Sequence, residues 1–352
     1  GDTGKAAMAG FADVPGTRII VFYPKGGVSR VQELQMVTQK GDNTAVVAIH
    51  GNFDDAQTGV KKIFGDRAFG ERLAKKGFQL SSANSINIGR LVPQVVYYVY
   101  AYAKLVENGE IQNGDPINIT VPTGNFGNIL AAYFAKQMGI PVKTLICASN
   151  DNKVLYDFFR TGIYDKKREF ILTSSPSMDI LISSNLERLI YLSTGCDAEA
   201  NRSLMEQLNT QGSYEVTETM KEAMKDFTGG FATEAENAAE IKKVYEDTGY
   251  VIDTHTGVAS AVYRAYAEKT GDTTPTVIAS TASPYKFSHS VMEAIRGDEG
   301  SKDEFAIIDE LCSVSGVKIP AAVEEIRNAE IRHKRESDVE DMEKTVAEIL
   351  GL

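Results

Sequence analysis

The alternation of apolar strands with helices most constrains what this chain can fold into. Runs of β-branched and other apolar residues occur at 17–23, 44–50, 117–121, 142–148 and 274–281, and stretches with helical periodicity separate them. Continuously apolar strands of this kind are normally covered on both faces. Strands that alternate with helices form parallel sheets with helices against them. The sequence therefore predicts an α/β protein with mainly parallel sheets flanked by helices.

The length of the chain predicts more than one domain. Its 352 residues exceed what a single hydrophobic core usually supports. A long apolar helical pattern at 87–109 follows the first strand, helix and strand. We therefore predict a smaller, partial α/β domain over residues 1–86 and a larger α/β domain over residues 87–352. Charged stretches at 199–248 and from residue 302 onward have helical spacing, and we expect them to form solvated helices of the larger domain.

Composition and charge exclude several classes of protein. Acidic residues number 48 and basic residues 37, and the resulting net charge of −11 argues against sequence-independent binding of nucleic acid or of an anionic membrane. No apolar run approaches the roughly 20 residues of a membrane-spanning helix. The three cysteines lack a CxxC pair, and the four histidines lie far apart without a carboxylate at metal-ligand spacing. We therefore expect no metal and a reducing cytoplasm as the location.

The stretch VPTGNFGNILAAYF at 121–134 carries the most chemical information. It places Gly124, Asn125, Phe126, Gly127 and Asn128 between an apolar strand and a helix. Glycines let the backbone turn tightly, so that successive N–H groups can converge on a phosphate at the positive end of the helix. The alternative is an ordinary strand-to-helix connection in which the asparagines cap the helix.

Two other clusters place cations and small polar side chains just before a helix. One is FYPKGGVS, which holds Lys25 and Ser29, and the other is SSANSINIGR, which holds Asn84, Ser85, Asn87 and Arg90. A guanidinium with short hydroxyl and amide donors is typical of sites that bind a phosphate dianion. A polar loop that ends in a helix cap is the alternative for the second cluster.

Two more motifs lie at the start of the sequence and at residues 278–287. The opening GDTGKAA overlaps the end of a P-loop, but Ala6 follows Lys5 where a P-loop needs Ser or Thr. We interpret it instead as a turn that presents N–H groups and the Thr3 hydroxyl to a carboxylate. In IASTASPYKF, the hydroxyls of Thr281 and Ser283 follow a strand. Such a hydroxyl can hydrogen-bond a heteroaromatic nitrogen, although an ST-turn explains the pattern equally well.

Taken in order, GDTGKAA, FYPKGGVS, HGNFDDAQ, SANSINIGR, VPTGNFGN and STASPYKF resemble the motifs of the threonine synthases, pyridoxal-phosphate enzymes of fold type II. The resemblance runs from Gly1 to about residue 290. It implies the two-domain fold of the tryptophan synthase beta type, with pyridoxal 5′-phosphate as cofactor. It also implies conversion of O-phospho-L-homoserine and water to L-threonine and phosphate, by a monomer or homodimer.

The resemblance also implies roles for individual residues. The cofactor phosphate would bind to Gly124, Asn125, Phe126, Gly127 and Asn128, and Thr281 would face the pyridine nitrogen. Asp2 and Thr3 would lie near the substrate carboxylate. The substrate phosphate would be received by Lys25, Ser29, Asn84, Ser85, Asn87 and Arg90. Ser283 stands where similar enzymes often have histidine. A neutral partner such as Thr281 would moderate the electron sink of the cofactor, which suits elimination and replacement better than transamination.

The Schiff-base lysine of the family belongs to a Phe-Lys-Asp motif upstream of the GDTG turn. No lysine of this sequence has that context, so we assign the catalytic role to none and expect residues 1–352 alone to be inactive. The loop donors would still hold free cofactor at about micromolar to millimolar affinity. Two alternatives stay open: a phospho-lyase that acts on another O-phosphorylated amino acid, and a non-catalytic protein that binds a phosphometabolite.

Overall fold

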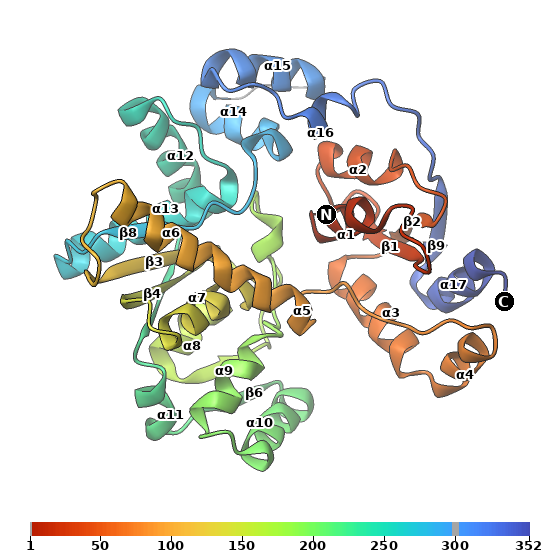
Figure 1. The fold of residues 1–352 in the computed structure, drawn as a ribbon, viewed down its shortest axis with the longest axis horizontal. Helices are drawn as coiled ribbons and strands as arrows, with labels where there is room; N and C mark the ends of the chain where they lie inside the picture. The colour runs from red at the N-terminus through yellow and green to blue at the C-terminus, as the bar shows by residue number, and fades with distance from the viewer. Residues whose placement is uncertain (1, 298–302) are drawn as a thin grey trace. The chain divides into compact units, whose positions relative to one another are not determined.

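The apolar runs form two separate parallel sheets in the computed structural model, which describes residues 2–297 and 303–352 (Figure 1). The chain divides into unit 1, residues 1–84 and 302–352, and unit 2, residues 85–301. All five predicted strands are present, with ends that differ from the prediction by a few residues. These are β1 (Ile19–Pro24), β2 (Thr44–His50), β3 (Ile117–Pro122), β4 (Val142–Ser149) and β8 (Thr276–Ile278).

Unit 1 contains a three-stranded parallel sheet in the order β1-β2-β9, where β9 is Arg335–Asp338. Buried apolar side chains of β2 and of its helices, among them Ile49, Phe69 and Met342, form its core. The helices of this unit are α1 (Asp2–Phe11), α2 (Arg30–Val37), α3 (Phe53–Gly65), α4 (Arg67–Lys75), α15 (Glu304–Ser315), α16 (Ala321–Glu324) and α17 (Met342–Leu350), with a 3₁₀ turn η4 (Val339–Asp341).

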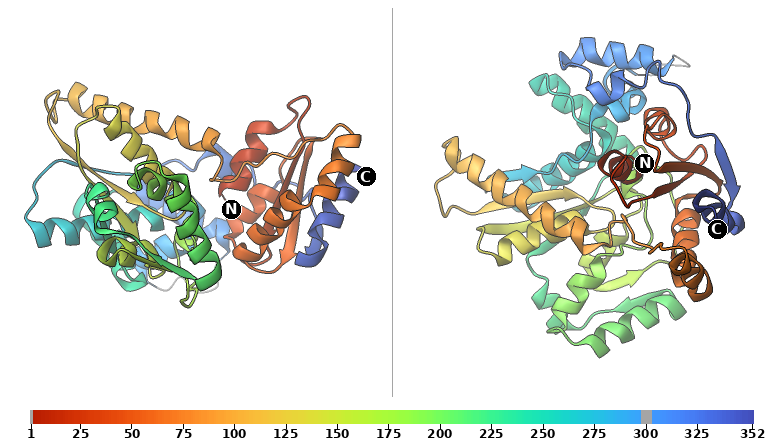
Figure 2. Two further views of the ribbon diagram at one scale, coloured as in Figure 1. Left: turned by 90° about the horizontal axis from the view of Figure 1, so that it is seen from below. Right: turned by 45° about the vertical axis from the view of Figure 1, so that its right-hand side comes forward.

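The C-terminal segment corrects the predicted domain organisation. We expected it to form helices of the larger domain, but it belongs to unit 1. Strand β9 pairs in parallel with β2, with Ile49 opposite Ser337, and α17 contributes Met342 and Val346 to the core of this unit. Figure 2 shows β9 and α17, in blue, beside the red and orange elements of unit 1. The short strand RESD is too polar for its sequence to predict a strand.

Unit 2 contains a four-stranded parallel sheet in the order β7-β4-β3-β8, where β7 is Phe227–Phe231. A small antiparallel pair, β5 (Ile163–Asp165) and β6 (Ser213–Glu215), accompanies it. The helices and 3₁₀ turns are α5 (Ile88–Leu91), η1 (Val92–Gln94), α6 (Val95–Glu107), α7 (Gly127–Gln137), α8 (Val154–Thr161), η2 (Pro176–Met178), α9 (Leu186–Ser193), α10 (Ala198–Gln211), α11 (Glu218–Ala223), α12 (Glu234–Thr248), α13 (Thr254–Thr270), η3 (Pro284–Lys286) and α14 (Ser288–Arg296).

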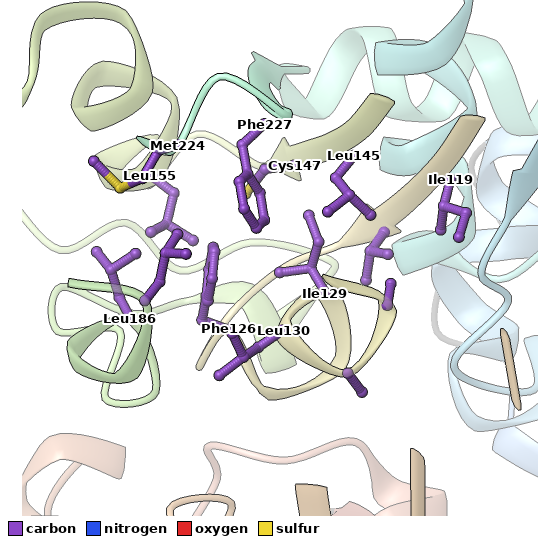
Figure 3. Close-up of a cluster of buried hydrophobic side chains, with 14 of the residues drawn as sticks. Ile119, Phe126, Ile129, Leu130, Leu145, Cys147, Leu155, Leu186, Met224 and Phe227 are labelled. Atoms are coloured by element: carbon purple, nitrogen blue, oxygen red, sulfur yellow. The ribbon is translucent and has the colours of Figure 1, made fainter. Parts of the chain in front are cut away.

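Both faces of the unit 2 sheet are covered, as the continuously apolar strands predicted. Leu145 and Cys147 of β4 belong to the core cluster that contains α7 and α8, whereas Ile146 and Ala148 belong to the cluster that contains α13. This alternation is the two-residue period of a strand between two helical layers. Figure 3 shows part of the first cluster, in which Leu145 and Cys147 lie with side chains of α7.

Two predicted helical stretches are interrupted. The pattern at 87–109 divides into α5, η1 and α6 because Pro93 lacks an N–H group to donate to an α-helical bond. The stretch at 199–248 contains β7, whose sequence FTGGF is poor in β-formers. A side chain on Gly229 would contact Tyr156 of α8, and one on Gly230 would overlap Val262 of α13. The glycines therefore serve close packing of helices on both faces of the strand.

Among residues 2–297 and 303–352, no helix combines the length and apolar character needed to cross a bilayer. Over the same residues, no three His, Cys, Asp or Glu side chains are grouped closely enough to hold a metal ion.

Candidate functional site

The predicted cofactor residues meet at one edge of the unit 2 sheet. Strands β3 and β8 are parallel neighbours, with Thr120 opposite Ile278, and the next N–H group, that of Ala279, donates to the Thr120 carbonyl at 2.9 Å. The chain therefore leaves both strands at the same edge, toward Gly124 after β3 and toward Thr281 after β8. Ligands of open α/β sheets bind outside the carboxyl ends of the strands, which is where these two loops lie.

Phe126 shapes the turn between β3 and α7. It adopts a left-handed backbone conformation, with φ 65°, and its side chain is 1% exposed. Its ring centroid lies 6.0 Å from that of Phe159 and 5.7 Å from that of Phe227. Figure 3 shows Phe126 and Phe227 within the same cluster of buried side chains. A non-glycine residue in this region costs roughly 1–3 kcal/mol, and burial of the aromatic ring offsets that cost. The ring thus anchors the loop in the core.

Neither asparagine of the loop caps α7, so the capping alternative is wrong. The N-cap residue is Phe126 itself, without a side-chain cap hydrogen bond. The Asn125 Oδ1 atom accepts from the Ser184 hydroxyl at 3.0 Å, and the Asn128 Oδ1 atom accepts from the Tyr98 hydroxyl. The first N–H groups of α7 are consequently left to other acceptors.

A second segment, Ser183–Asn185, binds the carbonyl side of the loop. The Ser183 hydroxyl donates to the Gly124 carbonyl at 2.7 Å. The backbone N–H and the side-chain amide of Asn185 both donate to the Asn125 carbonyl, at 3.1 and 3.0 Å. Within the described residues, the N–H groups of Gly124 through Ile129 have no acceptor. With its carbonyls occupied, the loop presents a row of N–H donors.

Gly124 is needed because of a close backbone approach. A Cβ atom at this position would overlap the carbonyl oxygen of Ser177 in η2, whereas one at Gly127 would meet only the Asn185 amide nitrogen, at 3.4 Å. The loop therefore combines unoccupied N–H donors, the positive end of an 11-residue helix and a backbone without side-chain obstruction at Gly124. This set of donors fits a phosphate dianion.

The two hydroxyls after β8 have different surroundings. Thr281 is exposed at the sheet edge. Ser283 is the N-cap residue of η3, and its hydroxyl accepts from the Tyr285 N–H at 3.3 Å. The local cap thus accounts for the Ser283 hydroxyl, whereas the role of Thr281 stays a prediction.

Comparison with solved structures places the chain in a family. Threonine synthase from Brucella melitensis with bound pyridoxal phosphate superposes with a TM-score of 0.79 and 37% identity, over 100% of this chain and 69% of that one. Yeast threonine synthase gives a TM-score of 0.81 and 32% identity, over 99% and 68%. The chain belongs to the threonine synthase family. The predicted resemblance and the fold type II α/β architecture are therefore confirmed.

Sequence comparisons agree with this family. The model of the C-terminal region of threonine synthase matches residues 256–349. Human threonine synthase-like 1 is 42% identical over 84% of this chain and 40% of its own length. Threonine synthase from Saccharomyces cerevisiae is 36% identical over 90% of this chain and 63% of its own length. The chain thus spans about two fifths to three fifths of the length of these relatives.

The SSANSINIGR cluster lies partly against the loop Gly124–Ile129. The Asn185 amide that donates to the Asn125 carbonyl also donates to the Ser85 carbonyl at 3.0 Å. The Arg188 guanidinium donates to the Ile86 carbonyl at 2.8 Å. Asn87 caps α5 by accepting from the Gly89 N–H at 2.9 Å. The structure therefore brings this threonine synthase motif to the loop through Asn185.

The Arg90 side chain of the same motif is partly buried, and this desolvation lowers its pKa. Removal from water strengthens the attraction between a guanidinium and an anion. This environment is compatible with the predicted contact to a substrate phosphate.

The remaining predicted substrate residues belong to unit 1. Asp2 and Thr3 lie in the first turn of α1, and Asn84 ends the N-terminal part of the unit.

The Lys25 ammonium pairs with Glu336 of β9 at 2.6 Å, which lowers the pKa of the Glu336 carboxyl. Ser29 caps α2 by accepting from the Gln32 N–H at 3.2 Å. The assignment of these residues, and of Ser85, Asn87 and Arg90, to the substrate stays a prediction.

Several residues that shape the site had no recognisable signal in the sequence. Ser183, Ser184 and Asn185 precede α9 and resemble an ordinary helix start, yet they bind a loop about 60 residues earlier in the chain. Asp253 and His255 are buried at the start of α13. The contacts of these residues join segments 59 and 78 residues apart, which a single sequence does not reveal.

Proposed function

We propose that the protein is a pyridoxal-phosphate-dependent threonine synthase, which converts O-phospho-L-homoserine and water to L-threonine and phosphate. The observation that carries the proposal is the row of N–H donors from Gly124 to Ile129, in a chain of the threonine synthase family. The solved relative from Brucella melitensis contains pyridoxal phosphate, which is the group that we propose for this loop. We further propose a cytoplasmic location and a monomeric or homodimeric state.

The residues of unit 2 would hold the two ends of the cofactor. The N–H groups of Gly124 through Asn128 would bind its phosphate, with the positive end of α7 behind them. The Thr281 hydroxyl would hydrogen-bond the pyridine nitrogen from the end of β8. When bound, the cofactor supplies an electron sink for negative charge at the substrate carbon that carries the amine. A neutral Thr281 partner would limit that sink and favour elimination followed by addition of water.

The substrate would be held by its two anionic groups. We propose that Asp2 and Thr3 lie near its carboxylate, and that Lys25, Ser29, Asn84, Ser85, Asn87 and Arg90 receive its phosphate. For Lys25 this requires its ammonium to exchange the carboxylate of Glu336 for the phosphate. That exchange is feasible because the Lys25 and Glu336 side chains are 51% and 44% exposed, and ion pairs in contact with water contribute little to stability.

The first experiment is cofactor binding to the full-length protein. Titration followed by fluorescence would compare pyridoxal 5′-phosphate with pyridoxal, which has no phosphate. We expect the phosphate to increase affinity at least about 10-fold, because each hydrogen bond to a charged group is worth roughly 1.5–3 kcal/mol. Equal affinities would contradict the assignment of the loop.

The second experiment identifies the reaction. The full-length protein is incubated with O-phosphohomoserine, and released phosphate and amino-acid products are quantified. Equal amounts of phosphate and threonine are expected. Phosphate with an unsaturated or keto product instead of threonine would indicate a phospho-lyase. Phosphate-dependent binding without turnover would indicate a non-catalytic phosphometabolite-binding protein.

A further inference from the structure

We propose that His255, oriented by the buried carboxylate of Asp253, is a positioning residue for the loop Gly124–Ile129. The inference rests on the proposed function in one respect, since it takes the ligand of this loop to be the phosphate of pyridoxal phosphate. Among the described residues, His255 forms no hydrogen bond to the loop. It acts through Ser177, whose N–H it binds and whose carbonyl lies against Gly124.

The hydrogen bonds of His255 define its protonation state. The ring is 2% exposed, and its Nε2 atom accepts from the Ser177 N–H at 3.2 Å. A peptide N–H can only donate, so Nε2 carries the lone pair and Nδ1 carries the proton. Nδ1 lies 3.1 Å from Asp253 Oδ1 and donates to it. A neutral imidazole with both nitrogens engaged therefore links a buried carboxylate to Ser177.

Ser177 transmits this constraint to the loop. Its carbonyl oxygen occupies the space that a side chain at position 124 would take. The same short segment is held at its other end by Asp179, whose Oδ1 atom accepts from the side chains of Asn150 at 2.7 Å and Thr173 at 2.7 Å. With both ends fixed, the Ser177 carbonyl stays against Gly124, and the N–H groups that follow keep their direction.

The second oxygen of Asp253 leads to the other end of the proposed cofactor site. The Thr256 hydroxyl donates to Asp253 Oδ2, and it lies 3.2 Å from the Ser280 hydroxyl. Ser280 directly precedes Thr281, the proposed partner of the pyridine nitrogen. One buried carboxylate thus connects the phosphate end, through His255 and Ser177, with the ring end, through Thr256 and Ser280.

Helix capping alone does not account for this arrangement. Asp253 is the N-cap residue of α13 and accepts from the N–H groups of His255 at 2.9 Å and Thr256 at 3.4 Å. A cap of this kind makes no demand on the side chain at position 255. The imidazole instead reaches a peptide 78 residues earlier in the chain. A side chain with one donor and one acceptor is required there.

The test compares His255→Phe with His255→Gln in the full-length protein. Dissociation constants for pyridoxal phosphate and for pyridoxal are measured for each variant. We expect His255→Phe to weaken binding of pyridoxal phosphate about 10-fold and to leave pyridoxal within about 2-fold, because only the phosphate contacts the loop. His255→Gln offers an amide oxygen to the Ser177 N–H and should recover most of the lost affinity.

Phe287→Leu is the matched packing control. It changes the aromatic ring whose centroid lies 4.9 Å from that of His255 but leaves both ring nitrogens bonded. The ratio of the two dissociation constants should stay at the wild-type value. An unchanged ratio in His255→Phe would overturn the inference alone. An equal loss of affinity for both ligands would mean that His255 has only a general structural role, which would also overturn the inference. Absence of any phosphate preference in the wild type would overturn the proposed function as well.

A second measurement needs no variant and therefore holds even if His255→Phe fails to fold. The ¹⁵N resonances of the His255 ring report its tautomer. We expect the proton on Nδ1 and the lone pair on Nε2. A proton on Nε2 would leave no acceptor for Ser177 and would contradict the inference.

Discussion

At the scale of single residues, burial decides how side chains of the site behave. Phe126 keeps a left-handed backbone because its ring is enclosed by Phe159 and Phe227. Tyr98, which holds the amide oxygen of Asn128, has a raised pKa because it is desolvated. Its hydroxyl therefore stays protonated and remains a donor over the whole physiological range. The sequence motif predicts the loop, whereas the backbone conformation of Phe126 and the protonation of Tyr98 depend on the buried residues around them.

Cys147 provides the first prediction at this scale. Complete burial in β4 raises the pKa of its thiol to about 12, whereas Cys196 is exposed. Because the thiolate is the reactive form, iodoacetamide at pH 8 should modify Cys196 in the folded protein and leave Cys147 unmodified until the protein unfolds. Peptide mass spectrometry with and without urea provides the measurement. Modification of both cysteines at similar rates in the native protein would contradict it.

Asp272 provides a prediction on pH. Hydrogen bonds from Lys143 and Thr274, together with Asn118, hold the pKa of its carboxyl well below the usual range. A carboxyl with a depressed folded-state pKa stabilises the protein above its unfolded pKa near 4, and this contribution is lost as the pH falls further.

Asp272→Asn should therefore lower the free energy of unfolding by ~1 kcal/mol at pH 7 and by less at pH 3. Urea unfolding at both values gives the comparison. Asp247→Asn, in an exposed pair with Lys243, is the control and should change little at either pH. A loss for Asp272→Asn that is equal at both pH values would contradict the assigned role of the carboxylate.

At the scale of elements, the candidate site is built from strand β3, the loop Gly124–Ile129 and helix α7. The strand delivers the loop at the sheet edge, Ser183–Asn185 binds its carbonyls, and the helix supplies the positive end. The sequence predicts these three parts because a β-period, a glycine-rich turn and a helical period follow each other directly. It does not predict Ser177, which lies against the loop from η2.

Gly124→Ala tests this element. The new Cβ would overlap the Ser177 carbonyl, so the loop or η2 must move. We expect at least about a 10-fold loss of affinity for pyridoxal phosphate, measured by fluorescence titration, with displaced N–H donors as the reason. Gly127→Ala is the matched control, since its Cβ would meet only the Asn185 amide nitrogen at 3.4 Å. Equal effects of the two substitutions would show that the Ser177 contact is unimportant.

At the scale of the whole molecule, unit 1 is built from the two ends of the chain. Its sheet is complete only when β9 joins β2, about 290 residues after it, and α17 closes the core with Met342. Unit 2 forms from one continuous stretch between them. The stability of unit 1 should consequently depend on C-terminal residues that the sequence analysis assigned to the larger domain.

Met342→Ala tests this dependence. The side chain is 1% exposed in the unit 1 core, and its truncation should lower stability by about 2–4 kcal/mol. Hydrogen exchange should accelerate in β1 and β2, while β3 and β4 keep their protection. Lys344→Ala, at an exposed position of the same helix, is the control. Equal loss of protection in both sheets would mean that the two units unfold as one.

Features that depend on neighbouring residues could be predicted from the amino-acid sequence alone. Apolar runs located five strands, and the ordered motifs identified the family and the loop at Gly124. Three features became known only from the folded structure: residues 303–352 belong to unit 1, β7 is a strand, and His255 binds the Ser177 segment that lies against the loop. Those outcomes rest on contacts between residues tens to hundreds of positions apart, for which local periodicity carries no information.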